Sequence, residues 1–291
     1  MLGGGEKLGG RGTDEFRGRA SSEESIERQT AVQARGGPNE GGLEMTKAFE
    51  LRNEIAVTAT PEQVWDAITT GPGIDSWFMG RNEVEPRKGG AARTVHPGFT
   101  LEATVTAWEP PTRFATRSPE DEKGAYHSFE YLVDARAPGD TAVRWVHSGV
   151  LAGDWEAEYE AMGEGDPMYL DKLAQYLTYF LGRTGTPIDA FGPNVAGRHD
   201  VWETFRRGLG LPGPVAIGDE VRLTPAGLEP LDGVVDYLSP SFLGVRTADG
   251  LYRFILGFEG TVMVGHHDFS ANVDEEQAER TWASWLAQTF S

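Results

Sequence analysis

Histidine is the side chain whose pKa lies closest to neutral pH, so histidines are the first candidates for acid–base chemistry in a new sequence. Of the six in this 291-residue chain, His127 and His147 are the best placed, because each stands in an alternating apolar segment that turns it toward the inside of a sheet. Asp75 or Glu102 is a candidate carboxylate partner, although no spacing requires either one. A lone inward histidine also serves as a hydrogen-bonded structural residue, so both roles stay open for this pair.

Two further sequence patterns are similar to known binding motifs, one for a metal and one for a dinucleotide. The run His266–His267–Asp268 suggests a metal, but adjacent strand residues point to opposite faces, and His266 with Asp268 supplies only two ligands. We therefore expect no metal there and interpret the run as a surface strand end. The glycines of 208–213 match a dinucleotide-binding pattern, yet they follow a helix and include Pro212, which indicates a loop. We expect no cofactor.

Strand parity also gathers apolar side chains around the two histidines. Val143 and Trp145 share a face with His147, and a hairpin closing at 138–140 brings this face beside that of the preceding strand. The residues that we predict to line a ligand cavity are Trp77, Phe78, Trp108, Phe129, Tyr131, Val143, Trp145, His147, Tyr169, Leu173 and Tyr176. The alternative interpretation is that the same residues fill a packed core.

The elements that must position these residues follow an α+β order. A strand over 49–58 precedes a helix over 61–69, for which Thr60 is the N-cap and Pro61 the first helical residue. A long helix over 166–183 closes the series. Between the helices, turn residues separate five predicted strands at 91–96, 101–108, 113–117, 127–135 and 141–147. This order predicts one curved antiparallel sheet with a long C-terminal helix on it.

Several motifs in this stretch carry a family resemblance. They are Ala59–Thr69 (ATPEQVWDAIT), Trp77–Phe78, Gly89–Gly90, Ala107–Phe114 (AWEPPTRF) and Thr141–Gly149. Together, over residues 47–183, they closely resemble the Aha1-like (activator of Hsp90 ATPase homologue-like) branch of the START/polyketide-cyclase (SRPBCC) superfamily. The resemblance implies a helix-grip (START-like) fold with a cavity between sheet and C-terminal helix. It implies no single activity, because the superfamily hosts carriers, cyclases and uncharacterised proteins.

Three regions are expected along the chain. Residues 1–44 hold 11 of the 38 glycines and no apolar face, which predicts a disordered head. Residues 45–185 form the helix-grip domain, and 186–291 form a second, degenerate helix-grip-like α+β lobe. In that lobe we predict helices around 201–205 and 274–290, with strands at 220–223, 233–238, 242–247, 251–257 and 261–267. No first strand is evident before Gly197.

Composition limits the partners. The formal charge is −19, from 45 acidic and 26 basic residues, and such a field repels phosphate backbones and anionic lipid. We therefore expect neither nucleic acid nor membrane as a partner. The chain has no cysteine, which excludes disulfides and thiolate sites and fits a cytoplasmic location.

These observations favour a protein that binds a small hydrophobic or aromatic molecule. Two alternatives stay open: a cyclase- or hydrolase-type enzyme that uses a cavity histidine, and a chaperone-linked protein-interaction module with a protein partner. The identity of the ligand, the oligomeric state and the roles of the head and second lobe do not follow from the sequence.

Overall fold

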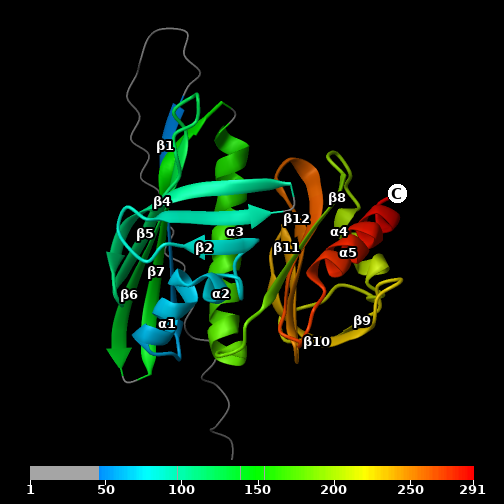
Figure 1. Cartoon of the computed structure of the whole chain (residues 1–291). Helices are drawn as coiled ribbons and strands as arrows, with labels where there is room; N and C mark the ends of the chain where they lie inside the picture. Colours follow the sequence, from blue (N-terminus) through cyan, green and yellow to red (C-terminus); the bar gives the residue numbers. More distant parts are fainter. Residues whose placement is uncertain (1–45, 97, 138, 154) are drawn as a thin grey trace, which may run out of the picture.

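The computed structural model describes residues 46–96, 98–137, 139–153 and 155–291, and these form two antiparallel sheets with helices beside them (Figure 1). The head predicted to be disordered, residues 1–44, lies outside the described residues. The first sheet contains seven strands within the described ranges, in the order β1-β7-β6-β5-β4-β3-β2. The strands are β1 (Thr46–Val57), β2 (Arg81–Val84), β3 (Ala91–His96), β4 (Phe99–Glu109), β5 (Arg113–Arg117), β6 (Tyr126–Ala137) and β7 (Asp140–Ala152).

The helices of the first lobe are α1 (Pro61–Thr69), α2 (Gly71–Ile74) and α3 (Trp155–Gln175), which continues as a π-helical turn, η1 (Tyr176–Phe180). The start of α1 is the predicted capping box. The Thr60 hydroxyl accepts from the Gln63 amide at 3.3 Å, and the Gln63 side chain accepts from the Thr60 amide at 2.8 Å. A seven-stranded sheet with a long C-terminal helix is the predicted helix-grip fold, which is thereby confirmed.

The helix α3 begins at Trp155, well before the predicted start at Asp166. Asp-Pro reads as an N-cap followed by a first helical residue, and two glycines precede it, so the sequence favours a start at that point. The structure extends the helix because Trp155, Tyr159 and Met162 pack against a buried apolar group on β1 and β7. This burial offsets the poor helix propensity of the glycines.

The second sheet repeats the plan of the first with one strand fewer. Its described strands lie in the order β8-β13-β12-β11-β10-β9, which matches the first sheet without a counterpart of β2. The elements are β8 (Thr186–Asn194), α4 (Val201–Gly208), β9 (Glu220–Leu223), β10 (Leu231–Leu238), β11 (Phe242–Thr247), β12 (Gly250–Leu256), η2 (Phe258–Gly260), β13 (Thr261–Asp268) and α5 (Glu275–Thr289). The tandem arrangement is confirmed.

The first strand that sequence reasoning missed in this lobe is β8. It carries Pro187, Gly192 and Pro193, which are poor strand formers and hid the pattern. An edge strand tolerates proline because one side of it needs no amide donors, and β8 is the edge that pairs with β13.

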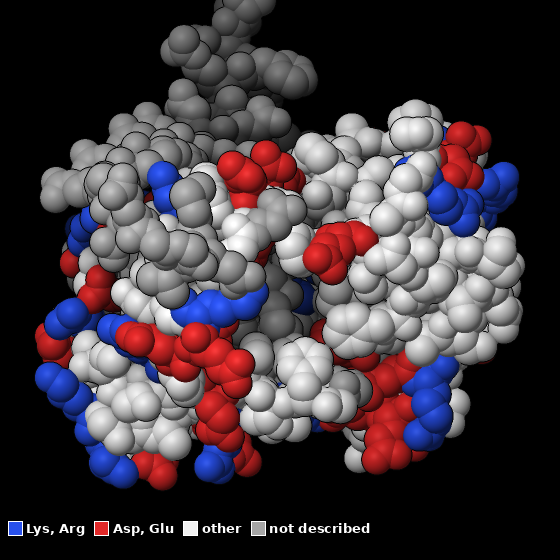
Figure 2. All heavy atoms as spheres, turned by 90° about the horizontal axis from the view of Figure 1, so that it is seen from above, with Lys and Arg blue, Asp and Glu red and all other residues white. Residues whose placement is uncertain are grey.

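The helix α3 lies between the two sheets, so the lobes share it (Figure 1). One side of α3 contributes Leu173 to the core of the first lobe, and Met168 packs with Tyr237, Phe242 and Ile255 of the second. The opposite face of the second sheet is covered by α4 and α5. Seen from above, a furrow separates the upper parts of the lobes (Figure 2).

Candidate functional site

The hairpin of β6 and β7 sets out the candidate site. In the observed register Phe129 pairs with His147 and Tyr131 pairs with Trp145, so the side chains share the face that strand parity predicts. The facing helix α3 contributes Asp166. Because the hairpin is held by a continuous ladder, these groups are positioned by rigid elements and not by loops.

His127 and His147 are in direct contact, and a carboxylate lies at each end of the pair. His147 Nδ1 is 3.0 Å from Asp166 Oδ2, His147 Nε2 is 3.0 Å from His127 Nδ1, and His127 Nε2 is 3.5 Å from Glu158 Oε1. An ionised carboxylate only accepts, so His147 carries its proton on Nδ1. When both rings carry a single proton, His147 Nε2 accepts from His127 Nδ1–H. We call the four groups Glu158, His127, His147 and Asp166 the relay.

The relay runs from the surface into the core. The His127 and Glu158 side chains are 33% and 37% exposed, whereas those of His147 and Asp166 are 5% and 8% exposed. Burial, followed by the repulsion that a protonated His147 ring would exert, lowers the pKa of His127 to about 4. Burial also raises the pKa of Glu158. His127 is therefore neutral near pH 7.

The relay ends on an aromatic cluster. The Phe129 ring lies 4.3 Å from the His147 ring and 5.7 Å from Trp145, centroid to centroid, and Tyr131 stacks on Trp145 at 5.6 Å. The structure brings all the predicted cavity residues except His147 into one apolar cluster, and His147 joins it through Phe129. The buried residues among them are Trp77, Tyr131, Val143, Trp145, Leu173 and Tyr176. Its half-buried members are Phe78, Trp108, Phe129 and Tyr169.

One polar atom inside this cluster lacks a partner. The Trp145 side chain is 1% exposed, and its indole Nε1 makes no hydrogen bond within the described part of the chain. In contrast, the Trp77 indole donates to the carbonyl of Ala67 at 2.9 Å. Buried donors are nearly always paired in folded proteins, so this unpaired indole is an exception that requires an explanation.

Neither carboxylate suggested by the sequence partners a histidine. Asp75 accepts from the Asn82 amide at 2.7 Å and pairs with Arg81, and Glu102 is an exposed partner of Arg93. The actual partners are Asp166 and Glu158. Asp166 is the first residue of the predicted helix and Glu158 precedes it, so the sequence did not indicate that the two face the histidines from one helix. With that helix in place, their spacing of eight residues puts them on one face, about two turns apart.

The interpretation of His266–His267–Asp268 as a surface strand end is wrong. The two histidines do point to opposite faces of β13, but both are fully buried because both faces of the second sheet are covered. His266 packs on the Trp282 ring at 4.4 Å, and His267 Nε2 donates to the Phe78 carbonyl of the first lobe at 2.7 Å.

Other classes of site find no support in the described residues. Among them, no group of three or more His, Cys, Asp or Glu side chains is arranged to hold a metal ion. Residues 209–213 form a loop after α4, as predicted for the glycine pattern. Within the same described ranges, no helix combines the length and apolar character needed to cross a membrane.

Comparison with known proteins gives a family match for most of the first lobe. Residues 58–178 match the model of the family described as "Activator of Hsp90 ATPase homolog 1-like protein". A search of curated proteins gave no significant match.

Solved structures with a similar fold include three bacterial examples. A protein from Mesorhizobium loti shares 24% identity over 45% of this chain and 98% of its own, with a TM-score of 0.40. CalU16 from Micromonospora echinospora shares 20% identity over 52% of this chain and 85% of its own, with a TM-score of 0.38. DynU16, a protein of the dynemicin biosynthetic locus, shares 17% identity over 82% of this chain and 95% of its own, with a TM-score of 0.41.

Proposed function

Since the first lobe, through residues 58–178, belongs to the Activator of Hsp90 ATPase homolog 1-like family, we propose that it binds a small apolar or aromatic molecule between its sheet and α3. Membership indicates a ligand-binding or polyketide-cyclase-like protein and leaves ligand and reaction unspecified. The aromatic cluster forms the apolar wall of the proposed site. The relay supplies its polar end.

The observation that carries this proposal is the unpaired indole of Trp145. An unsatisfied buried donor costs about 1–3 kcal/mol, and a ligand oxygen that accepts from Nε1 recovers this cost. The rings around it, Tyr131 and Phe129, offer flat apolar surface to the rest of the ligand. The ligand chemistry that fits is an apolar or aromatic body with at least one hydrogen-bond acceptor.

The relay gives such a ligand an orientation. Its buried half is fixed by the contact of His147 with Asp166, and its outer half, His127, reaches solvent. Polar groups of a ligand are expected at this end, because the remainder of the cluster is apolar.

Acid–base catalysis is the second candidate, and the relay is the observation that favours it. A carboxylate that orients one histidine, which in turn contacts another, is the arrangement of an oriented base. However, a pKa of about 4 makes His127 neutral and only weakly basic near pH 7, whereas an efficient base has a pKa near the working pH. Ligand binding is therefore preferred to catalysis as the proposed function.

The test uses the full chain. Native mass spectrometry of protein purified from its own cells is expected to detect a co-purifying small molecule. In parallel, the neutral probe N-phenyl-1-naphthylamine is expected to bind with micromolar affinity, and Val143→Trp, which fills the cluster, is expected to abolish binding.

A matched pair of variants tests the indole. Trp145→Phe keeps an aromatic ring but removes the donor, so a co-purifying acceptor-bearing ligand is expected to bind about tenfold more weakly, which corresponds to about 1.4 kcal/mol. Trp282→Phe makes the same change in the second lobe and is expected to leave binding unchanged. If the folded chain binds no probe, or if a folded Val143→Trp variant binds it equally well, the proposed function fails.

A further inference from the structure

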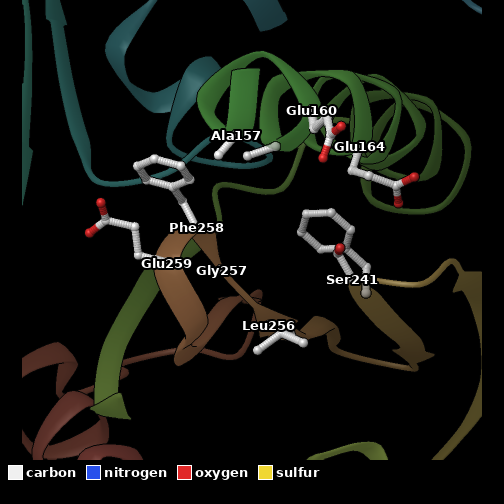
Figure 3. Close-up of a pocket in the computed structure, with 10 residues that line it drawn as sticks. Ala157, Glu160, Glu164, Ser241, Leu256, Gly257, Phe258 and Glu259 are labelled. Atoms are coloured by element: carbon white, nitrogen blue, oxygen red, sulfur yellow. The ribbon is translucent and has the colours of Figure 1, made fainter. Parts of the chain in front are cut away.

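A cleft of about 300 Å³ lies outside the proposed ligand site, between α3 and the second sheet (Figure 3). One wall is the first half of α3, through Ala157, Glu160, Ala161 and Glu164. The other wall is formed by residues at the start of β11 and by the end of β12 with η2, where Phe242 and Phe258 lie. The same stretch of α3 therefore borders the relay through Glu158 and this cleft through its other face.

The walls of the cleft combine apolar side chains with carboxylates. Phe242 is buried, whereas the Phe258 side chain projects into the open and is 44% exposed. The facing residues on the helix, Ala157 and Ala161, are small and leave room above the rings. An exposed phenyl ring on a concave surface favours the binding of a flat or alkyl group.

The charges around the cleft are all negative. Glu160 and Glu164 are four residues apart, so they stand on the same face of α3, and Glu259 lies on the opposite wall. In Figure 3, Glu160 points toward the gap above the rings, and the other two carboxylates lie toward its ends. None of the ten described lining residues is Lys or Arg, and none of these three carboxylates forms an ion pair with a described residue.

We propose that this cleft binds an organic cation: an ammonium group attached to an aromatic or short alkyl body. The ammonium group lies between Glu160 and Glu164, where it relieves the repulsion of two like charges one turn apart. The face of Phe258 adds a cation–π contact, and Phe242 contacts the apolar body. Anionic ligands are repelled from this cleft. The proposal does not depend on the function proposed for the first lobe.

Two small molecules of nearly equal shape test the charge requirement. 2-Phenylethylammonium and 2-phenylethanol are titrated against the full chain at low ionic strength and followed by ligand-observed NMR. The ammonium compound is expected to bind with a dissociation constant of about 1–10 mM, as suits a ligand of this size. The alcohol is expected to bind at least tenfold more weakly. Added salt is expected to weaken the binding of the ammonium compound and to leave that of the alcohol unchanged.

Paired variants test whether the ammonium compound binds in this cleft. Glu160→Gln combined with Glu164→Gln is expected to weaken ammonium binding about tenfold, and Phe258→Ser is expected to weaken both ligands. The control, Glu62→Gln combined with Glu156→Gln, changes the net charge equally at exposed helix positions outside the cleft and is expected to stay within twofold of the parent. Equal affinity for the two ligands, no ammonium binding up to 50 mM (about five times the weakest expected constant), or unchanged binding in the first variant overturns the proposal.

Discussion

Replacement of His127 by Gln separates the contribution of the relay from the other titrating groups of the protein. Glutamine keeps an amide N–H that can donate to His147 Nε2, but it has no proton to gain between pH 7 and 4. Any change in the pH dependence of stability therefore reports the titration of His127. The size of the change follows from its environment.

The pKa of His127 is lowered from 6.5 to about 4, first by burial and then by the repulsion that a protonated His147 ring would exert. Between these values the unfolded chain binds a proton that the folded chain does not, so stability is lost as pH falls from about 7 toward 4. Linkage gives a loss of about 1.8 kcal/mol between pH 7 and pH 5. Because 33% of the side chain is exposed, solvent screening reduces this to about 1 kcal/mol.

The assay is urea unfolding of parent and His127→Gln at pH 7 and pH 5, followed by circular dichroism. The parent is expected to lose about 1 kcal/mol more than the variant over this interval, or about 2–4 °C in melting temperature. His199→Gln, at an exposed position, is the matched control and is expected to follow the parent. Equal losses in parent and His127→Gln would show that burial does not lower the pKa of His127, and the assignment of a neutral His127 would have to be abandoned.

Three stability predictions complete the set. Trp65→Ala is expected to cost about 3–5 kcal/mol in urea unfolding, because the ring is 8% exposed and packs in the core of the first lobe; parental stability would contradict this packing. Gly163→Ala with Gly165→Ala is expected to raise stability by about 1–2 kcal/mol, because added methyl groups meet open space in the helix; destabilisation would refute the continuous helix. Arg253→Leu is expected to cost about 3–5 kcal/mol by leaving Asp236 buried without its cation, and Asp236→Asn in the same background should recover part of the loss.

Local alternation was sufficient to predict the strand half of the candidate site. A period of two fixes which side chains share a face, so the contact between the strands that carry His127 and His147 follows once the hairpin at 138–140 is recognised. The capped helix at 61–69 was equally predictable, since Thr60, Pro61 and Gln63 determine it locally. Such local patterns predict the structure correctly where tertiary packing favours the same conformation.

The helical half was not predictable from the same signals. Gly163, Gly165 and Pro167 argue against a helix at the position where α3 runs, and only its packing on β1 and β7 overrides them. The predicted helix therefore began at Asp166, and this residue was not recognised as the partner of His147. The burial of His266 was missed for a related reason: nothing in the local sequence states that both faces of the second sheet are covered.

The placement of α3 between two sheets bears on how the relay is held. Lys172 is 1% exposed and donates to the Gly265 carbonyl of the second lobe at 2.6 Å, and Arg253 of β12 lies 3.5 Å from Asp171. These contacts fix the helix from the side opposite the first sheet. Asp166 stands on the same helix less than two turns away, so the second lobe helps to set the position of the carboxylate that orients His147. The isolated first lobe would expose Met168 and Lys172 to water and would lose this support. The ligand binding proposed for the first lobe is therefore expected to depend on both lobes.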